Sequence, residues 1–401
     1  MYQGVPDTLG SMVRVDTKVQ WTATSTRAMR VGPRIDVESD MTRWPDRRIL
    51  DLLGIEIPII QAPMAGSTTN EMVVAAAQAG GLGSLPSALL SVDQLKGALT
   101  SIRNSTKAPL NVNFFAHHTP SFDPAVQMRW RALLAPYYIE SGLDPAAPVA
   151  GAGRAPFDSA FCEVVEEFKP GIVSFHFGLP EKSLVRRVKA TGAKIISSAT
   201  TVSEAVWLEE NGVDAVVAMG FEAGGHRGNF LTHDMFTQVG TMALVPQVVD
   251  AVNIPVIAAG GIADGRGVAA ALMLGASAVQ IGTAYLFCPE AKIPAVHAQA
   301  LGDARDDNTA ITNVFTGRPA RSVVNRIMRE LGPLSESAPP FPTAAAALVA
   351  LKVKAEEAAR SDFTNLWSGQ AAKLAPRLSA GDLTRRLYQD ALKVIEGRTQ
   401  A

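Results

Sequence analysis

From Leu52 onward, short apolar runs alternate with segments whose apolar positions have helical spacing. The runs have the length and composition of buried strands. They cover residues 58–64, 82–87, 110–115, 172–177, 195–198, 215–220, 255–262 and 278–286. Eight such strand-and-crossover units within about 230 residues predict an α/β protein with a TIM (β/α)8 barrel. A doubly wound sheet would alternate in the same way, but the first strand turn lacks its Gly-x-Gly-x-x-Gly fingerprint.

The predicted barrel spans residues 46–290 and is flanked by other segments. Residues 1–45 show no steady periodicity and form an N-terminal extension. An insertion after the third strand, residues 117–157, is rich in Pro, Ala and Gly and lies on the loop side, where barrels bind their ligands, as a lid or wall. Residues 291–401 form a C-terminal helical substrate or lid portion, with helices expected at 294–301, 323–331 and 344–360.

Alternation along three strands places polar side chains on one face. In each strand the apolar residues share the opposite face, which suits the helix layer. Asn113, His176 and Gln280 then point into the barrel near the carboxyl ends of their strands. Because a buried polar group without a partner costs roughly 1–3 kcal/mol, either a ligand or a mutual polar network must satisfy them.

Glycine-rich turns follow the last two strands. Gly260 and Gly261 end the seventh strand, and Gly282-Thr283 ends the eighth. Loops at these two positions are the usual phosphate site of a barrel, although tight strand-to-helix turns would explain either one alone. Together with the inward amides, they favour a phosphate-bearing cofactor across the barrel mouth.

A further turn carries a histidine, in Gly224-Gly225-His226, directly after an apolar strand. Glycines allow close approach of the backbone to a ligand, and a histidine gains or loses a proton near neutral pH. The turn is therefore a candidate catalytic loop, and a surface or structural histidine is the alternative.

Composition and charge narrow the class of ligand. The 401 residues include 37 Lys and Arg against 38 Asp and Glu, a formal net charge of −1, which gives no general reason to bind nucleic acid or an anionic membrane. Cys162 and Cys288 are too few for a disulfide framework or a cysteine metal cluster, and no run reaches the roughly 18 apolar residues of a membrane span. A cytoplasmic protein with a small-molecule substrate and no metal is expected.

Six ordered segments resemble the FMN-dependent nitronate monooxygenase family, formerly called 2-nitropropane dioxygenases. They are Pro58-Ile-Ile-Gln-Ala-Pro-Met-Ala65, Asn111-Val-Asn-Phe114, Val173-Ser-Phe-His-Phe-Gly178, Glu222-Ala-Gly-Gly-His-Arg-Gly228, Ala259-Gly-Gly-Ile-Ala-Asp-Gly-Arg-Gly267 and Gln280-Ile-Gly-Thr-Ala284, with a weaker similarity at Trp367-Ser-Gly-Gln370. The segments are highly specific for an FMN barrel and less specific for the reaction.

The resemblance implies His226 as the catalytic base and His176 as a second active-site imidazole. It also implies a set of FMN-binding residues: Pro63, Met64, Ala65, Asn113, Met219, Gly224, Gly225, Gly260, Gly261, Gln280, Ile281, Gly282 and Thr283. In the related enzymes a bound nitronate reduces the flavin, and dioxygen then yields a carbonyl compound and nitrite. A neutral nitroalkane must first lose its α-proton to a base.

Two departures from the family pattern concern the substrate. Met219 stands where many of these enzymes have Gln, which removes one hydrogen bond to flavin or substrate. Residues 339–347 contain neither the Tyr nor the Lys that bacterial members tend to use for a small anionic substrate. A more apolar pocket with a larger or neutral substrate is expected.

Three hypotheses for function follow. The first is oxidation of alkyl nitronates, and of nitroalkanes, by dioxygen. The second is an FMN-dependent NAD(P)H reductase acting on a quinone or enoyl thioester, because barrel-type enoyl reductases share the Glu-Ala-Gly-Gly-His turn. The third is a flavin-free barrel that serves as a phosphosugar-binding or scaffold protein.

Overall fold

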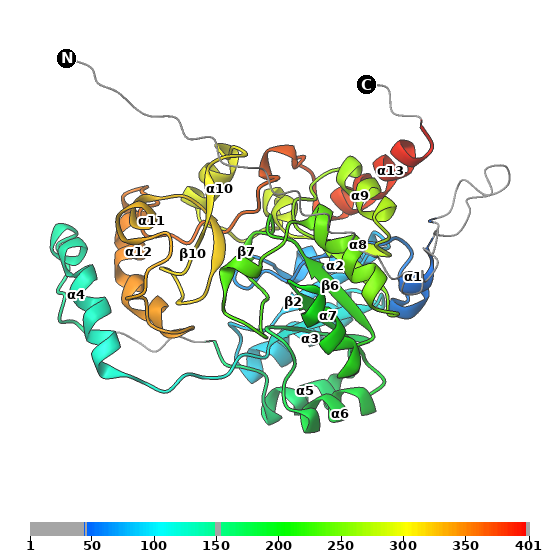
Figure 1. Ribbon diagram of the computed structural model, residues 1–401, viewed down its shortest axis with the longest axis horizontal. Coiled ribbons are helices and arrows are strands. Elements are labelled where there is room, and N and C mark those ends of the chain that lie inside the picture. Colours follow the sequence, from blue (N-terminus) through cyan, green and yellow to red (C-terminus); the bar gives the residue numbers. More distant parts are fainter. Residues whose placement is uncertain (1–43, 45, 149–153, 398–401) are drawn as a thin grey trace, which may run out of the picture.

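Eight parallel strands form a closed ring in the barrel part of the protein. The computed structural model, drawn in Figure 1, describes residues 44, 46–148 and 154–397. The strands run in the order β1-β9-β8-β6-β5-β4-β3-β2, and a parallel bridge between Ile60 and Leu82 joins the two ends. Their bounds are β1 Ile59–Gln61, β2 Gly83–Pro86, β3 Leu110–Phe115, β4 Ile172–His176, β5 Lys194–Ala199, β6 Ala215–Met219, β8 Val256–Ala259 and β9 Ala278–Ile281. The predicted TIM barrel is confirmed, and each strand lies where an apolar run predicted it. The extension predicted at 1–45 falls almost wholly outside the described residues.

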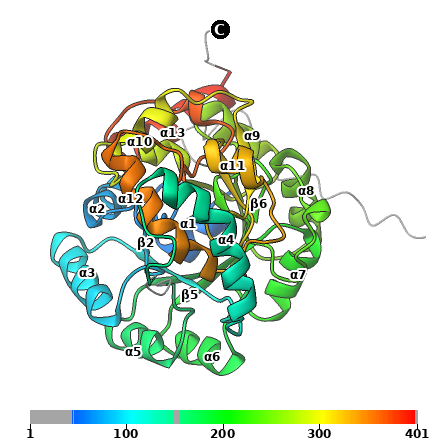
Figure 2. The same cartoon turned by 90° about the vertical axis from the view of Figure 1, so that its left-hand side faces the viewer.

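A layer of helices surrounds the ring, as the view in Figure 2 shows. The helices after successive strands begin at side chains that cap their first free N–H groups: Thr69 for α2, Ser91 for α3, Thr201 for α7 and Asp264 for α9. Their apolar faces join one large core with the strands. The bounds are α2 Asn70–Gln78, α3 Val92–Ser105, α5 Ser159–Phe168, α6 Lys182–Ala190, α7 Val202–Glu210, α8 Thr241–Ala251 and α9 Gly265–Met273. Helix α1 (Arg48–Leu53) lies at the end of the barrel opposite α4 (Pro124–Glu140) (Figure 1).

The C-terminal helix α13 (Ala380–Ile395) returns to this layer, where the sequence predicted no helix. It packs against α9 and α2, and its Thr384 hydroxyl lies 2.7 Å from that of the buried Tyr285. The cap at Ser379 and the buried residues Leu383, Leu387 and Ala391, which follow helical spacing, are a signal that could have revealed it.

A second, smaller core lies over one end of the barrel. It joins helix α4 (Pro124–Glu140), which the predicted insertion contains, to the 3-10 helix η3 (Thr343–Leu348) and to α12 (Val349–Glu357). The indole of Trp130 donates to the Ala344 backbone oxygen at 3.2 Å, and the Tyr138 hydroxyl donates to that of Ala347 at 2.7 Å. In Figure 2, α4 and α12 lie in front of the ring of barrel helices. The insertion is thus a packed wall, of which residues 149–153 lie outside the described part.

The expected helical character of the C-terminal portion needs a correction. Besides α10 (Ala295–Gly302) and α11 (Arg326–Leu331), it contains the antiparallel strands β10 (Thr309–Thr312) and β11 (Ala320–Val323). The helix predicted from residue 323 begins at Arg326 instead, because Val323 still pairs with Thr309. Strand β11 also pairs with the two-residue strand β7 (Gly225–His226), which comes from the barrel loop after β6. The three remaining 3-10 turns are η1 Met235–Thr237, η2 Thr283–Phe287 and η4 Ala372–Leu374.

Candidate active site

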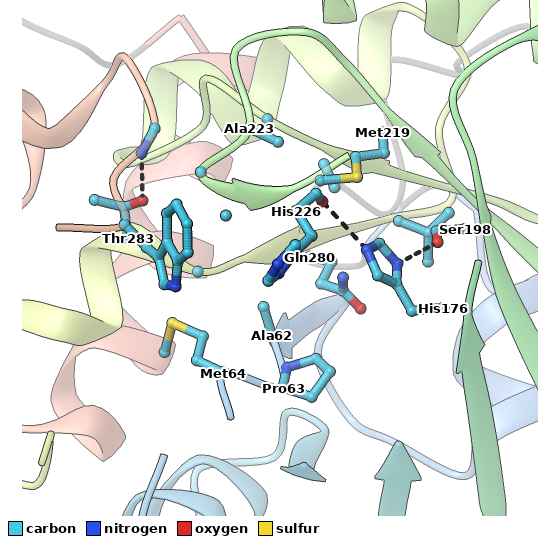
Figure 3. A pocket seen from close by; sticks show the side chains of 18 of the residues that line it. Ala62, Pro63, Met64, His176, Ser198, Met219, Ala223, His226, Gln280 and Thr283 are labelled. Atoms are coloured by element: carbon cyan, nitrogen blue, oxygen red, sulfur yellow. Dashed lines mark hydrogen bonds between the residues drawn. The ribbon is translucent and has the colours of Figure 1, made fainter. Parts of the chain in front are cut away.

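One pocket opens at the carboxyl ends of the barrel strands, and Figure 3 shows side chains that line it. Every residue predicted for the site lines it except Ile281, whose side chain is buried in the main core while the neighbouring Gln280 faces the pocket. The structure therefore brings the two histidines, the inward amides and the glycine turns into one cavity. Within the described part of the chain, no group of three or more His, Cys, Asp or Glu side chains is arranged to hold a metal ion.

The inward polar side chains divide into two layers. In the deeper layer, Ser84 links Gln61 to Asn111: its N–H donates to Gln61 Oε1 at 2.9 Å, and its hydroxyl accepts from Asn111 Nδ2 at 2.9 Å. In the upper layer, Asn113 donates to the Ser174 hydroxyl at 3.0 Å and lines the pocket with Gln280. The mutual network and the ligand site, weighed as alternatives from the sequence, thus occur at different depths.

Both ring nitrogens of His176 are engaged by protein groups. Nε2 lies 3.2 Å from the His226 backbone oxygen, which can only accept, so Nε2 carries the proton. Nδ1 then accepts from the Ser198 hydroxyl at 2.6 Å. Burial, and next the positive charge of Arg318, lower the pKa of His176 to about 3, so the ring is neutral. Figure 3 shows both contacts as dashed lines.

His226, in contrast, keeps one ring nitrogen open to the pocket. Its Nε2 lies 2.9 Å from the hydroxyl of Thr316, which in turn donates to the Arg318 backbone oxygen at 3.4 Å. Nε2 therefore donates to Thr316, and the lone pair of Nδ1 has no hydrogen-bond partner among the described residues. Burial, and then the charge of Arg154, hold the pKa of His226 well below its usual range.

Aromatic rings enclose the His226 imidazole. The rings of Trp367 and Phe341 both lie 5.3 Å from it, centre to centre, and Phe115 lies 6.3 Å away. Phe341 belongs to the segment 339–347 that lacks Tyr and Lys. Trp367 and Phe115 line the pocket, and Phe341 packs against the same imidazole, so the surroundings of this ring are apolar.

The glycine turns provide a cradle of bare backbone. Gly260 and Gly261 both have positive φ, +109° and +71°, and their N–H groups have no hydrogen-bond partner among the described residues. Gly224 is needed for a close approach, because a Cβ there would lie 2.5 Å from the Gly369 nitrogen. Gly369 itself donates to the Thr283 hydroxyl at 2.9 Å, so the segment near Trp367 completes this side of the site. Successive free N–H groups of this kind suit a phosphate.

Buried arginines support the histidine turn from behind. Arg227 is fully buried and donates to the backbone oxygens of Gly220 at 2.7 Å and Met219 at 2.9 Å. Arg318 donates to the Arg227 and Asn229 backbone oxygens and lies 3.9 Å above the Phe177 ring. Their charges disfavour a proton on either imidazole and favour an anion in the pocket.

Comparison with known proteins identifies the family. A sequence model described as "Nitronate monooxygenase" matches residues 46–390. The chain belongs to the nitronate monooxygenase family. It is 40% identical to a nitronate monooxygenase of Pseudomonas aeruginosa, over 86% of this chain and 98% of that protein. It is also 40% identical to one of Paraburkholderia phytofirmans, over 87% of this chain and 96% of that protein.

Two solved structures are similar to this chain over most of its length. A nitroalkane oxidase from Streptomyces ansochromogenes is 34% identical, with a TM-score of 0.79 over 88% of this chain and all of that one. FabK from Thermotoga maritima is 30% identical, with a TM-score of 0.66 over 87% and 97% of the two chains. Membership of a family of oxidoreductases excludes the third hypothesis, a flavin-free scaffold.

FMN is the cofactor of the nitronate monooxygenase family, and the residues present fit it. The unpartnered N–H groups of Gly260 and Gly261 match a phosphate. The helix behind them does not contribute its N-terminus, because Asp264 already caps α9 through the nitrogens of Arg266 and Gly267. The amides of Asn113 and Gln280 and the apolar Met64 suit the polar edge and flat face of the flavin ring.

Several residues of this nitronate monooxygenase site were missed from the sequence. Thr316 and Phe341 lie 90 or more positions after His226 and contact its ring, which no local pattern shows. Trp367 contacts the same ring, and the weaker similarity at Trp367-Ser-Gly-Gln370 was its only signal in the sequence. Ser198 was missed because it follows Ser197 at the end of β5, where the polar and apolar residues do not alternate. Arg154, in the insertion, also lines the pocket. The catalytic and cofactor roles of the predicted residues remain predictions.

Proposed function

We propose that this protein is an FMN-dependent nitronate monooxygenase that converts alkyl nitronates and dioxygen to a carbonyl compound and nitrite. Nitroalkanes become substrates where the enzyme first removes their α-proton. FMN, when bound, supplies the redox chemistry of the reaction. Asn113, Gln280 and the glycine turns hold it.

The observation that carries the proposal is the open Nδ1 of a neutral His226 inside this pocket. A neutral imidazole with a free lone pair can take the α-proton of a nitroalkane. Burial and neighbouring arginines would disfavour the resulting imidazolium, but the nitronate formed beside it carries a compensating negative charge. Thr316 orients the base, and His176 holds the backbone of the same residue.

The aromatic surround has a further effect on the substrate. Phe341, Trp367 and Phe115 exclude water from one side of the imidazole. Trp367 and Phe115 also line the pocket and offer an apolar surface to the hydrocarbon part of the substrate. A medium of low polarity strengthens each electrostatic contact to the charged nitronate group.

An NAD(P)H-dependent reductase is the second candidate. Met219, in place of Gln, lines the pocket. Because both candidates use the same flavin site, the residues of the cofactor cradle do not separate them. The two candidates differ in the electron donor, which is the nitronate in the first and NAD(P)H in the second.

Anaerobic mixing of the FMN-loaded protein separates the two candidates. Rapid bleaching of the flavin by ethyl nitronate, with slow or absent bleaching by NADPH, is the expected result. Bleaching by NADPH alone would contradict the first proposal and support the second. Oxygen uptake with nitrite formation then tests the overall reaction.

The buried free thiols of Cys162 and Cys288 support a cytoplasmic location for this enzyme. None of the helices in the described part of the chain is long and apolar enough to cross a membrane.

A further inference from the structure

We propose that Arg154 binds the anionic nitro group of the substrate and so makes the enzyme selective for nitronates over neutral nitroalkanes. This inference rests on the function proposed above. Arg154 belongs to the insertion after β3 and lines the pocket together with His226 and Phe115.

Charge in the pocket supports this role. Among the described residues that line it, Arg154 is the one with a formal charge; the others are apolar residues, glycines, amides, hydroxyls and imidazoles. Burial alone lowers the pKa of Arg154, with no carboxylate near enough to counteract it. A cation in such a place lacks a counter-ion, and an anionic ligand would provide one.

The other buried arginines near the site already use their guanidinium groups in hydrogen bonds to backbone oxygens. Arg227 and Arg318 donate to backbone oxygens, and Arg321 donates to the Phe221 oxygen at 2.9 and 3.1 Å. In the described part of the chain, the Arg154 side chain has no such partner. Its guanidinium is therefore free to donate two parallel hydrogen bonds to a planar, two-oxygen anion.

Arg154 lies on the opposite side of the barrel mouth from Gly260 and Gly261, the turn that suits a phosphate. The segment that follows Arg154 is fixed to the end of β3, because the Phe157 N–H donates to the Phe115 oxygen at 2.8 Å. Gly260 and Gly261 follow β8, and in the ring of eight strands β3 and β8 are four places apart in either direction. Arg154 thus enters from the opposite side of the barrel mouth, which points to the substrate rather than the FMN phosphate.

The same position explains how the site can lack Tyr and Lys in residues 339–347. Phe341 from that segment contributes an apolar ring, 5.3 Å from His226. The positive charge that a small anion requires comes instead from Arg154, in the insertion after β3. Arg154 thereby recognises the nitro group, and Phe115 and Trp367, which line the pocket, contact the hydrocarbon part of the substrate.

The test compares Arg154→Met and Arg154→Lys in the FMN-loaded enzyme with Arg129→Met, an exposed arginine on the same insertion. Loss of a bidentate charged contact should raise KM for ethyl nitronate about 10- to 100-fold in Arg154→Met, with a smaller change in kcat. KM for neutral nitroethane should change less than about threefold, since this uncharged substrate forms no ion pair with Arg154 that the substitution could remove. Arg154→Lys should recover part of the affinity, and Arg129→Met should match the wild type.

Nitrate, a planar anion that does not react, gives a readout independent of turnover. Calorimetric titration of the FMN-loaded protein should show nitrate binding that weakens in Arg154→Met by the same factor as KM for the nitronate. Unchanged nitrate affinity, or loss of FMN from Arg154→Met, would overturn the inference; the second outcome would make Arg154 a cofactor ligand. If the wild type fails to oxidise nitronates, the proposed function fails, while Arg154-dependent nitrate binding would still support the anion site.

Discussion

Nε2 of His176 lies 3.2 Å from the backbone oxygen of His226, so one imidazole of the active site holds the main chain of the other. Ser198 occupies the remaining nitrogen of His176 at 2.6 Å. His226 keeps Nδ1 open, with its Nε2 bound to Thr316. The two histidines that the sequence placed together therefore differ in what they can do, and only His226 has a nitrogen available to a substrate.

Replacement of the base is the first prediction. His226→Asn should lower kcat/KM for neutral nitroethane by about 100-fold or more, because removal of the α-proton needs the imidazole lone pair. Turnover of preformed ethyl nitronate should fall by less than about threefold, since that substrate has already lost the proton. Steady-state oxygen uptake with the two substrates measures the difference. Equal losses on both would assign His226 another role.

The partner of the base gives the second prediction. Thr316→Val removes the acceptor for Nε2–H at nearly constant volume, so nitroethane turnover should fall about tenfold through loss of orientation and of one hydrogen bond. The imidazolium loses more from this change than the neutral ring does, so the acid limb of the pH profile should move to lower pH. Thr316→Ser should restore both quantities. A purely structural role for Thr316 would lower stability and leave the pH profile in place.

Close packing around the cofactor cradle gives the third prediction. Gly224→Ala would bring a Cβ to 2.5 Å from the Gly369 nitrogen and 2.6 Å from the Ser368 carbonyl carbon. The Trp367 segment must then shift, so FMN should dissociate more easily, as measured by fluorescence of the released flavin. Gly97→Ala is the control, because a Cβ at that exposed helical position meets nothing within 4 Å. It should retain FMN fully and gain roughly 0.5–1 kcal/mol of stability. Retention of FMN by both variants would contradict the role given to Gly224.

The fourth prediction concerns acid stability. Burial lowers the pKa of His297 to about 4, and its Nε2 donates to the Trp367 oxygen at 3.0 Å. Below about pH 6.5 this residue is protonated in the unfolded chain but stays neutral in the folded protein. The free energy of unfolding therefore falls as the pH drops from about 6.5 towards 4. Between pH 8 and pH 5 the His297 imidazole should lower the free energy of unfolding by about 2 kcal/mol.

Denaturant unfolding with excess FMN at both pH values measures that loss. His297→Gln, which keeps a donor for the Trp367 oxygen, should reduce the pH dependence by this amount, whereas His233→Gln, at an exposed site, should not. If His297→Gln keeps the full pH dependence, the buried imidazole is not its source.

The sequence predicts the barrel well because the barrel strands are buried and helices such as α3, α5 and α6 bury one apolar face, so the pattern is local. The inward positions of Asn113, His176 and Gln280 follow from the same alternation. By contrast, β7 has only two residues and no periodicity, and its partner β11 lies about 95 positions later. Thr316 reaches His226 from a segment 90 positions later, and Arg154 reaches the pocket from an insertion, and in neither place does the local pattern carry information.

The pairing of His226 with Ala320 fastens the reactive imidazole to a strand outside the barrel. A variant in which the pairing of β7 with β11 is broken would retain every residue predicted to contact the flavin, yet it would lose the backbone contacts that position this ring. Yellow colour in such a variant would then report cofactor loading without reporting catalytic competence. Engineering of this scaffold for new substrates therefore has to treat residues 309–323 as part of the catalytic loop.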